Sequence, residues 1–283
     1  MIRKLNSRRS DILAMVFLAA LPLIYFYPVT LGQQIWYGDD IFLQFIPFGT
    51  ELAMALRAGR LPLWAPGMLN GFPLFAEGQV GALYPVNLVL YSLLPAYWAV
   101  SYQNLVHLVW AAWGMYVLAR RYGYDIASAI LAGIIFSFNG FVISHLIHVP
   151  FITTLSWLPW LAFLVTQFRW AHQSKKSGAW FIALTFTIAI QVLAGSPHIT
   201  LLSAITAILF GFFAFTTSPG EMKWHFRWRE LIWLTLSWGL GAGIATVQLI
   251  PTFELTQYSE RVNALNHAFR TISSLPVSAL LKL

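Results

Sequence analysis

The sequence predicts an all-α polytopic membrane protein, and three observations support this fold class. Hydrophobic residues make up 58% of the chain and charged residues 10%, whereas about a quarter of an ordinary soluble domain is charged. The apolar residues gather in runs long enough to cross about 30 Å of hydrocarbon as helices. Basic residues gather between alternate runs. We therefore expect a single transmembrane domain over residues 1–283.

The first apolar run covers residues 12–31 and follows Arg3, Lys4, Arg8 and Arg9. A basic start before an apolar run is also typical of a signal peptide. This run exceeds the usual apolar region of a signal peptide and lacks a clear small-residue cleavage site. We expect it to be retained as the first membrane span.

Six further apolar runs predict the remaining spans. They lie at about residues 99–119, 126–144, 151–168, 178–195, 199–216 and 231–250. The segment 86–94, between Pro85 and Pro95, is too short to cross a bilayer, so we expect it to lie at the interface or to re-enter. The chain stops where another apolar run begins, which predicts truncation at the C-terminus.

The basic residues predict the orientation, because cytoplasmic loops of membrane proteins carry an excess of Lys and Arg. With a cytoplasmic N-terminus, the inner segments hold Arg3, Lys4, Arg8, Arg9, Arg120, Arg121, Arg169, Lys175, Lys176, Lys223, Arg227 and Arg229. The outer segments then hold only Arg57, Arg60, Arg261, Arg270 and Lys282. This asymmetry predicts a multi-pass protein of the plasma membrane with a long extracytoplasmic loop at residues 32–85.

The long loop has an internal pattern of its own. A helix is expected to begin near Asp39 and Asp40, because Phe42, Phe45, Ile46, Leu52, Ala53 and Leu56 recur close to a period of 3.6 residues. Pro47 would kink this helix or begin its main body. An amphipathic helix on the outer membrane surface follows from the pattern. The Pro-, Gly- and Trp-rich segment behind it is expected to fold back over the helical bundle.

Asp39 and Asp40 form the adjacent acidic pair of this loop. A carboxylate that is partly desolvated at a membrane surface can serve as a general base or bind a divalent cation. A plain helix N-cap is the structural alternative. The sequence alone leaves the three roles open.

The other turns predicted to face outward also present polar groups. Asn139, His145 and His148 follow the third span, His198 follows the fifth, and Gln248 and Glu254 close the seventh. His145 and His148 are three residues apart and can share a helical face, as metal or phosphate ligands would require. Each histidine alone also fits an interfacial residue with a satisfied hydrogen bond. Their common side favours one cavity shared with the aspartates.

Nucleic acid is not an expected partner. Basic and aromatic residues alternate at 223–229, but this segment lies at a predicted cytoplasmic boundary, where such residues anchor helices in lipid headgroups. The chain has no cysteine, which excludes disulfides, thiolate metal sites and a cysteine nucleophile.

The order of several short motifs resembles that of the bacterial YfhO-type membrane proteins, which are similar to the GT-C superfamily of polyprenyl-phosphate-sugar glycosyltransferases. Within the long loop these motifs are DIFLQFIPF from Asp40, AGRLPLW from Ala58, NGFP from Asn70 and QVGALYP from Gln79. Farther along the chain they are FSFNG, SWLPW, AGSPH and PTFE, at 136–140, 156–160, 194–198 and 251–254. The resemblance covers nearly the whole chain, and family members are generally longer.

The resemblance implies a GT-C-like helical bundle that transfers a sugar from a polyprenyl-phosphate donor to a cell-envelope glycan or glycolipid on the outer face. It places the catalytic acid group at Asp40, with Asp39 second. Because they share the predicted outer side, the residues expected around the substrates are Gln44, Arg57, Arg60, Trp64, Asn70, Glu77, Gln79, Tyr84, His145, His148, His198 and Glu254. Trp64 and Tyr84 are expected to stack on a sugar, and the histidines to meet the departing phosphate. Asp40, His145 and His148 are the candidate ligands for a divalent cation.

Two other functions stay open at this level. A transporter or flippase of lipid-linked substrates would place ionisable groups at the bilayer midplane, where only His107 is expected to lie. A non-catalytic membrane scaffold would not need an acidic loop.

Overall fold

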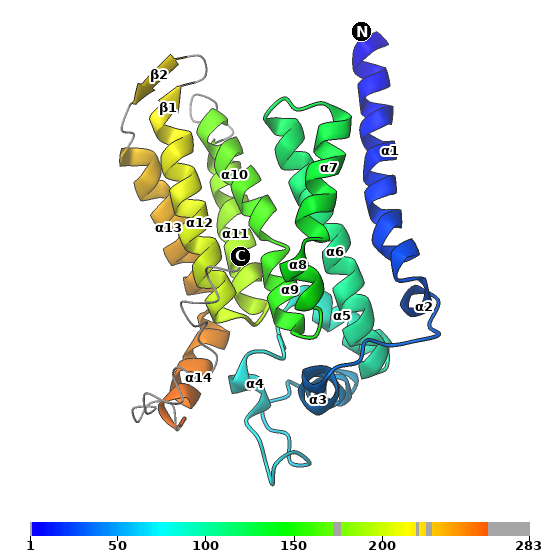
Figure 1. The fold of residues 1–283 in the computed structure, drawn as a ribbon. Helices are drawn as coiled ribbons and strands as arrows, with labels where there is room; N and C mark the ends of the chain where they lie inside the picture. Colours follow the sequence, from blue (N-terminus) through cyan, green and yellow to red (C-terminus); the bar gives the residue numbers. More distant parts are fainter. Residues whose placement is uncertain (1, 172–176, 219–220, 225–227, 260–283) are drawn as a thin grey trace, which may run out of the picture.

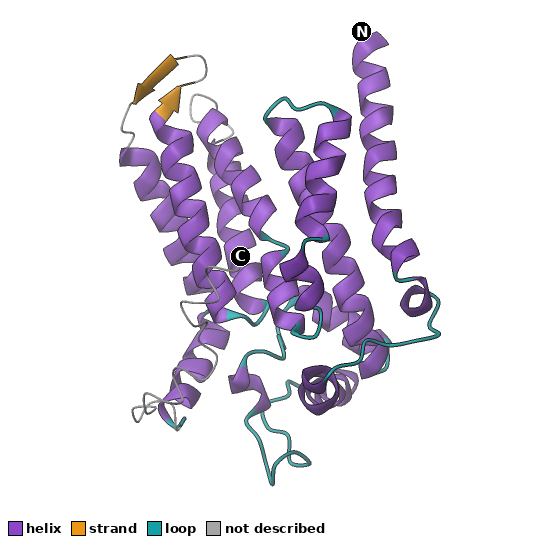
Figure 2. Cartoon of the chain, in the orientation of Figure 1, coloured by secondary structure: helices purple, strands orange, loops and turns teal. Residues whose placement is uncertain are grey.

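The computed structural model describes residues 2–171, 177–218, 221–224 and 228–259, and these residues are predominantly helical (Figures 1 and 2). The described residues do not include Lys175, Lys176, Arg227, Arg261, Arg270, Lys282 or the apolar run predicted at the C-terminus. The prediction of an all-helical class is therefore confirmed for most of the chain. One short antiparallel ribbon, β1 (Thr217–Ser218) with β2 (Glu221–Trp224), is an exception that the sequence did not predict.

Long helices make up the body of the molecule. Their bounds are α1 (Ile2–Tyr25), α6 (Ala96–Arg121), α7 (Ile126–Ser137), α10 (Leu158–Ala171), α11 (Ser177–Leu193), α12 (Pro197–Thr216) and α13 (Trp228–Ile244). The helices α1, α6 and α7 share a core of Ala14, Leu18, Ala112, Tyr116 and Ala129. A second core lies between α10, α11 and α13.

Three of the predicted spans are interrupted. The run 126–144 contains α7 and then α8 (Gly140–Ser144), whose N-cap is Asn139, with Oδ1 accepting from the Val142 N–H at 2.9 Å. The run 151–168 contains α9 (Val149–Leu155) and α10. The last run turns by 75° between α13 and α14 (Thr246–Gln257).

Helix length and composition identify a smaller set of candidate spans than the sequence pattern did. Within the described residues, Ile126–Ser144 and Val149–Phe168 are long and apolar enough to cross a membrane, and the bent pair α13 and α14 would make a third. The apolar helices Ser177–Leu193 and Pro197–Phe212 are shorter.

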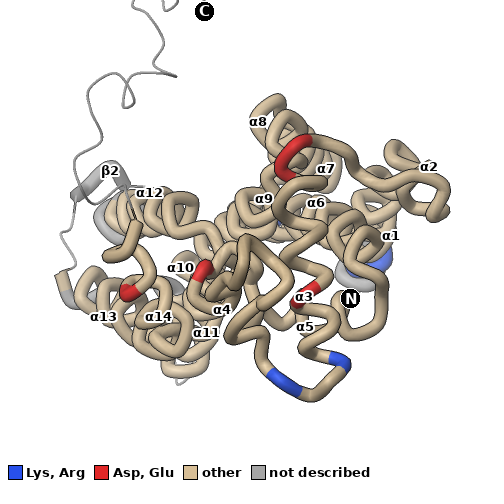
Figure 3. The backbone as a smooth tube through the Cα atoms, turned by 90° about the horizontal axis from the view of Figure 1, so that it is seen from below, with Lys and Arg blue, Asp and Glu red and all other residues tan. Residues whose placement is uncertain are grey.

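The two ends of the molecule differ in the segments they contain. In Figure 1 the start of α1, the α6–α7 connection and the β1–β2 ribbon lie at the upper end. The lower end holds α2 (Tyr27–Thr30), α3 (Ile46–Arg57), α4 (Leu74–Glu77) and α14. The loop 32–85 therefore lies at the end opposite to the N-terminus. Seen from below, acidic positions are distributed over this end, beside α8, α3, α4 and α14 (Figure 3).

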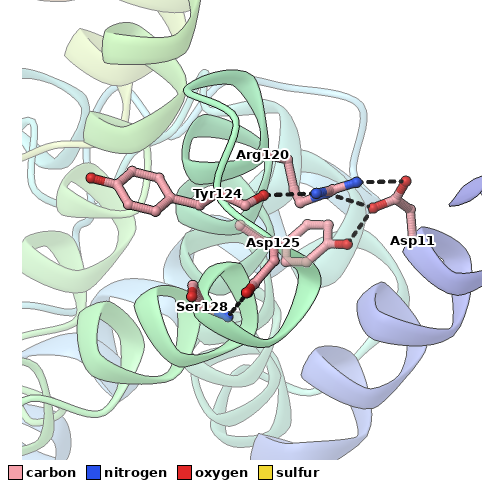
Figure 4. A network of polar contacts seen from close by, with 6 residues as sticks. Asp11, Arg120, Tyr124, Asp125 and Ser128 are labelled. Carbon is pink, nitrogen blue, oxygen red and sulfur yellow. Dashed lines mark hydrogen bonds and ion pairs between the residues drawn. The ribbon is translucent and has the colours of Figure 1, made fainter.

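An ion pair joins the first helix to α6 at the upper end. Asp11 Oδ1 accepts from Arg120 Nε at 2.8 Å and from the Tyr116 hydroxyl at 2.6 Å (Figure 4). Arg120 Nη1 also donates to the Tyr124 carbonyl, and Asp125 caps α7 through the Ser128 N–H. A carboxylate shared by a guanidinium and a hydroxyl fixes α1 against α6.

The helix predicted near Asp39 forms, but with an irregular first turn. Residues Ile41–Phe45 make a π-helical turn, η1, and Pro47 lies at the start of α3, as its fixed φ allows. Because a π-turn shifts the register, Phe42 is 61% exposed, whereas Phe45 and Leu52 are buried. The prediction that Phe42 lies on one apolar face with Phe45 and Leu52 is therefore wrong. The short segment after Tyr84 is a helix, α5 (Pro85–Leu93), of the expected length.

Candidate functional site

An ion pair at the lower end joins the long loop to the turn between α8 and α9. His148 Nε2 lies 3.1 Å from Asp40 Oδ2, and the side chains are 33% and 44% exposed. Asp40 makes no capping hydrogen bond through its side chain, so the N-cap role considered for this residue is not the one it adopts. The neighbouring Asp39 is exposed.

Two further histidines gather around the same place, as expected from their common side. The ring of Phe151, in α9, lies 5.8 Å from the His145 ring, 5.1 Å from the His148 ring and 4.3 Å from the His198 ring, measured between centroids. His145 Nδ1 lies 2.8 Å from the Phe141 carbonyl, which orients its imidazole. Burial, and then the charge of His148, lower the pKa of His198. Phe151 was not predicted, although it follows His148 by three residues.

A cavity of about 570 Å³ opens beside Asp40. Its polar lining is Asp40, Gln44 and Glu77, and its apolar lining includes Phe48, Met68 and Phe72. Three of the residues predicted around a substrate thus line one cavity. Such a mixture of apolar surface and few polar groups is typical of a small-molecule site.

Glu77 is the last residue of α4, and both of its carboxylate oxygens accept hydrogen bonds from Gln79. Its Oε2 accepts from the Gln79 N–H at 2.8 Å, and its Oε1 accepts from Gln79 Nε2 at 2.7 Å. Burial raises the pKa of Glu77 to about 7, although the hydrogen bonds from Gln79 and Val80 oppose the shift. Gln79, expected near a substrate, therefore acts directly on Glu77.

The segment 77–79 is fixed between two elements that are distant in sequence. Gln248 Nε2, in α14, donates to the Phe75 carbonyl at 2.6 Å. On the other side lies Gly195, with φ +95°, where a Cβ would come within 2.8 Å of the Gly78 carbonyl oxygen. Only glycine fits both this φ and this approach. The motifs around Glu77, Gly195 and Gln248 therefore meet at one point.

Tyr84 requires a correction. It is fully buried, its hydroxyl lies 2.7 Å from His107 Nε2, and it accepts from Trp157 Nε1 at 2.9 Å. A ring with no exposed surface cannot stack on a sugar. Tyr84 instead connects the end of the long loop to α6 and to the start of α10.

The remaining predicted residues lie apart from the cavity. Arg57 donates to the carbonyls of Ser92 and Leu94, so it closes the end of α5. Arg60, Trp64 and Asn70 are exposed in the loop after α3, and Glu254 is exposed on α14. In the described part of the chain none of these residues lines the cavity beside Asp40. The three histidines and Asp39 do not line it either, so the prediction of one cavity shared by the histidines and both aspartates is wrong.

The candidate cation site lacks a complete set of ligands. The described residues contain no group of three or more His, Asp or Glu side chains placed to hold a metal ion. The contact between Asp40 and His148 brings together two such side chains. Nδ1 of His148 is buried and has no hydrogen-bond partner among the described residues.

Comparison of the chain with known protein families, with curated proteins and with solved structures finds no match.

Proposed function

We propose that the chain is a multi-pass membrane protein that transfers a sugar from a polyprenyl-phosphate donor to a cell-envelope acceptor on the extracytoplasmic face, as a GT-C-like enzyme. The observation that carries the proposal is the meeting of His145, His148 and His198 around Phe151, with His148 in contact with Asp40. Asp40 in turn lines a cavity. The order of motifs in the long loop supports the same reaction class.

Exposed apolar surface supports membrane insertion. Large apolar side chains are exposed along α1, α12 and α13, including Ile12, Phe17, Leu201, Ile205, Leu236 and Leu240. Water-soluble proteins rarely expose apolar surface on this scale, whereas lipid solvates it. The cytoplasmic N-terminus belongs to the proposal and rests on the distribution of basic residues.

The geometry is suited to glycosyl transfer at a membrane surface. A lipid-linked donor travels in the plane of the bilayer, so its phosphate would arrive near the ends of the apolar helices. The histidines around Phe151 offer imidazole groups to the phosphate that departs. Asp40 either accepts a proton from the acceptor hydroxyl or holds the His148 ring in place through its carboxylate, and Asp40→Asn removes the carboxylate that both roles require.

The test is sugar transfer by the full-length protein in liposomes that contain labelled polyprenyl-phosphate sugars and envelope glycolipids. Asp40→Asn is expected to lower the rate about 10²- to 10⁴-fold, the usual contribution of a general acid or base. The matched control is Glu51→Gln, which removes a carboxylate of α3 that does not line the cavity. Transfer at the wild-type rate by Asp40→Asn, at equal amounts of folded protein, would contradict the proposal.

A further inference from the structure

A second carboxylate shares the cavity with Asp40. Glu77, the last residue of α4, lines the same space of about 570 Å³. Two carboxylates in one substrate-sized cavity can divide the work of a displacement reaction when their surroundings differ. The surroundings of Asp40 and Glu77 differ in both burial and partners.

Asp40 contacts His148 through its carboxylate. Its Oδ2 lies 3.1 Å from His148 Nε2, and its side chain is 44% exposed. A carboxylate in contact with an imidazole stabilises the protonated ring and fixes its orientation. This contact fixes the direction of the His148 ring and occupies one carboxylate oxygen of Asp40.

Glu77 has the opposite surroundings. The two donors that hold it both come from Gln79, at 2.8 and 2.7 Å, and neither carries a charge. Burial raises the pKa of Glu77 to about 7, where a base is both deprotonated in part and strong enough to accept a proton. The titratable groups on the surrounding elements are Asp40, which lines the same cavity, and His148, which contacts Asp40. His198 lies in the first turn of α12, and Glu254 lies on α14.

We propose that Glu77 is the general base of the transfer reaction and that Asp40 is a positioning residue that holds the His148 ring. This inference rests on the proposed function and assigns the proton transfer within it. In the step, the acceptor hydroxyl gives its proton to a Glu77 carboxylate oxygen. The acceptor oxygen bonds to the anomeric carbon, the bond from that carbon to the phosphate oxygen breaks, and the electron pair leaves with the polyprenyl phosphate. Glu77 then returns the proton to solvent.

The deciding experiment is the pH dependence of kcat/KM for sugar transfer by the full-length protein in liposomes. Because Glu77 must be deprotonated to act, the wild-type value is expected to rise with pH and to level off above about pH 7. Glu77→Gln is expected to lower the plateau about 10²- to 10⁴-fold and to abolish this acid limb. Asp40→Asn is expected to lower the rate and to keep the limb. Glu51→Gln is expected to leave the plateau and the acid limb unchanged.

A second variant tests the assignment without removing the carboxylate. Gln79→Ala deletes the donor to Oε1, which destabilises the ionised form of Glu77, so the acid limb is expected to move to higher pH. Infrared spectra of protein with ¹³C-labelled glutamate give a readout that needs no substrate. A protonated carboxyl band is expected to titrate near pH 7 in the wild type and to be absent in Glu77→Gln.

The outcomes separate the two proposals. Transfer by Glu77→Gln at the wild-type rate, with the acid limb in place, would overturn the role of Glu77 and leave the glycosyltransferase standing. An acid limb that disappears in Asp40→Asn instead would return the role of base to Asp40. Absence of transfer by the wild type with every donor would overturn the enzyme and the base together.

Discussion

At the scale of single residues, Asp40 and Glu77 show how surroundings separate two similar groups. Asp40 lies next to an imidazole and remains accessible to water. Glu77 is partly buried at the end of α4, where its ionised form loses hydration that two hydrogen bonds from Gln79 restore only in part. The loss of hydration brings the protonated form of Glu77 into the neutral pH range.

The raised pKa of Glu77 predicts a pH-dependent stability. The folded state binds this proton more tightly than the unfolded state, so the contribution to stability is complete below about pH 4.5 and is lost as pH rises through about 7. At pH 8 the wild type is expected to be less stable than Glu77→Gln by at most about 3 kcal/mol, and at pH 4 the two should be similar.

Thermal unfolding of the two proteins in detergent at pH 5 to 8 measures this difference. Glu51→Gln serves again as the control, because it removes a carboxylate without altering the cavity. Parallel pH profiles for the wild type and Glu77→Gln would mean that Glu77 is as well solvated in the folded state as in the unfolded chain.

At the scale of elements, the position of Glu77 depends on the turn between α11 and α12. Gly195 has φ +95°, and its Cα faces the Gly78 carbonyl so closely that no Cβ fits. Gly195→Ala is expected to lower the free energy of unfolding by about 1 to 3 kcal/mol and to displace the segment 77–79. Sugar transfer should fall more than stability alone would explain, because the carboxylate moves with its loop.

A helical glycine with free space around it is the matched control for that prediction. A Cβ added to Gly239, in α13, would meet no neighbouring atom within 4 Å, so Gly239→Ala should be neutral or slightly stabilising. Unfolding by heat and transfer rate are measured for both variants. Equal behaviour of Gly195→Ala and Gly239→Ala would show that the turn does not hold Glu77 in place.

At the scale of the whole molecule, the long loop and the N-terminus lie at opposite ends (Figure 1). If the chain crosses the membrane as proposed, the two ends face different compartments. Because the chain has no cysteine, single cysteines can report each end. An impermeant thiol reagent is expected to label Ala58→Cys, after α3, in intact cells. It is expected to label Tyr124→Cys, before α7, only once the cells have been lysed.

Both positions are exposed, so access is set by the membrane and not by burial in the protein. A reagent that labels Tyr124→Cys in intact cells and spares Ala58→Cys would reverse the proposed orientation. Labelling of both would show that the chain does not separate its ends across a bilayer.

The apolar runs in the sequence located most helices, because apolar runs of this length generally fold as helices. They missed the interruptions at Asn139 and Ala245, and the periodicity misplaced Phe42. These details depend on local hydrogen bonding: Asn139 caps a new helix, and the π-turn before α3 rotates the following face. A hydropathy pattern averages over such single-residue effects.

The sequence by itself determined the helical class, the place of the long loop between the first two long helices, and the common side of Asp40 and the three histidines. Only the tertiary structure decided which groups meet. It paired Asp40 with His148, buried Tyr84, and brought Glu77 into the cavity beside Asp40 between Gly195 and Gln248. The reason is physical: periodicity follows from local backbone geometry, whereas burial and partners depend on packing between segments that lie far apart in the chain.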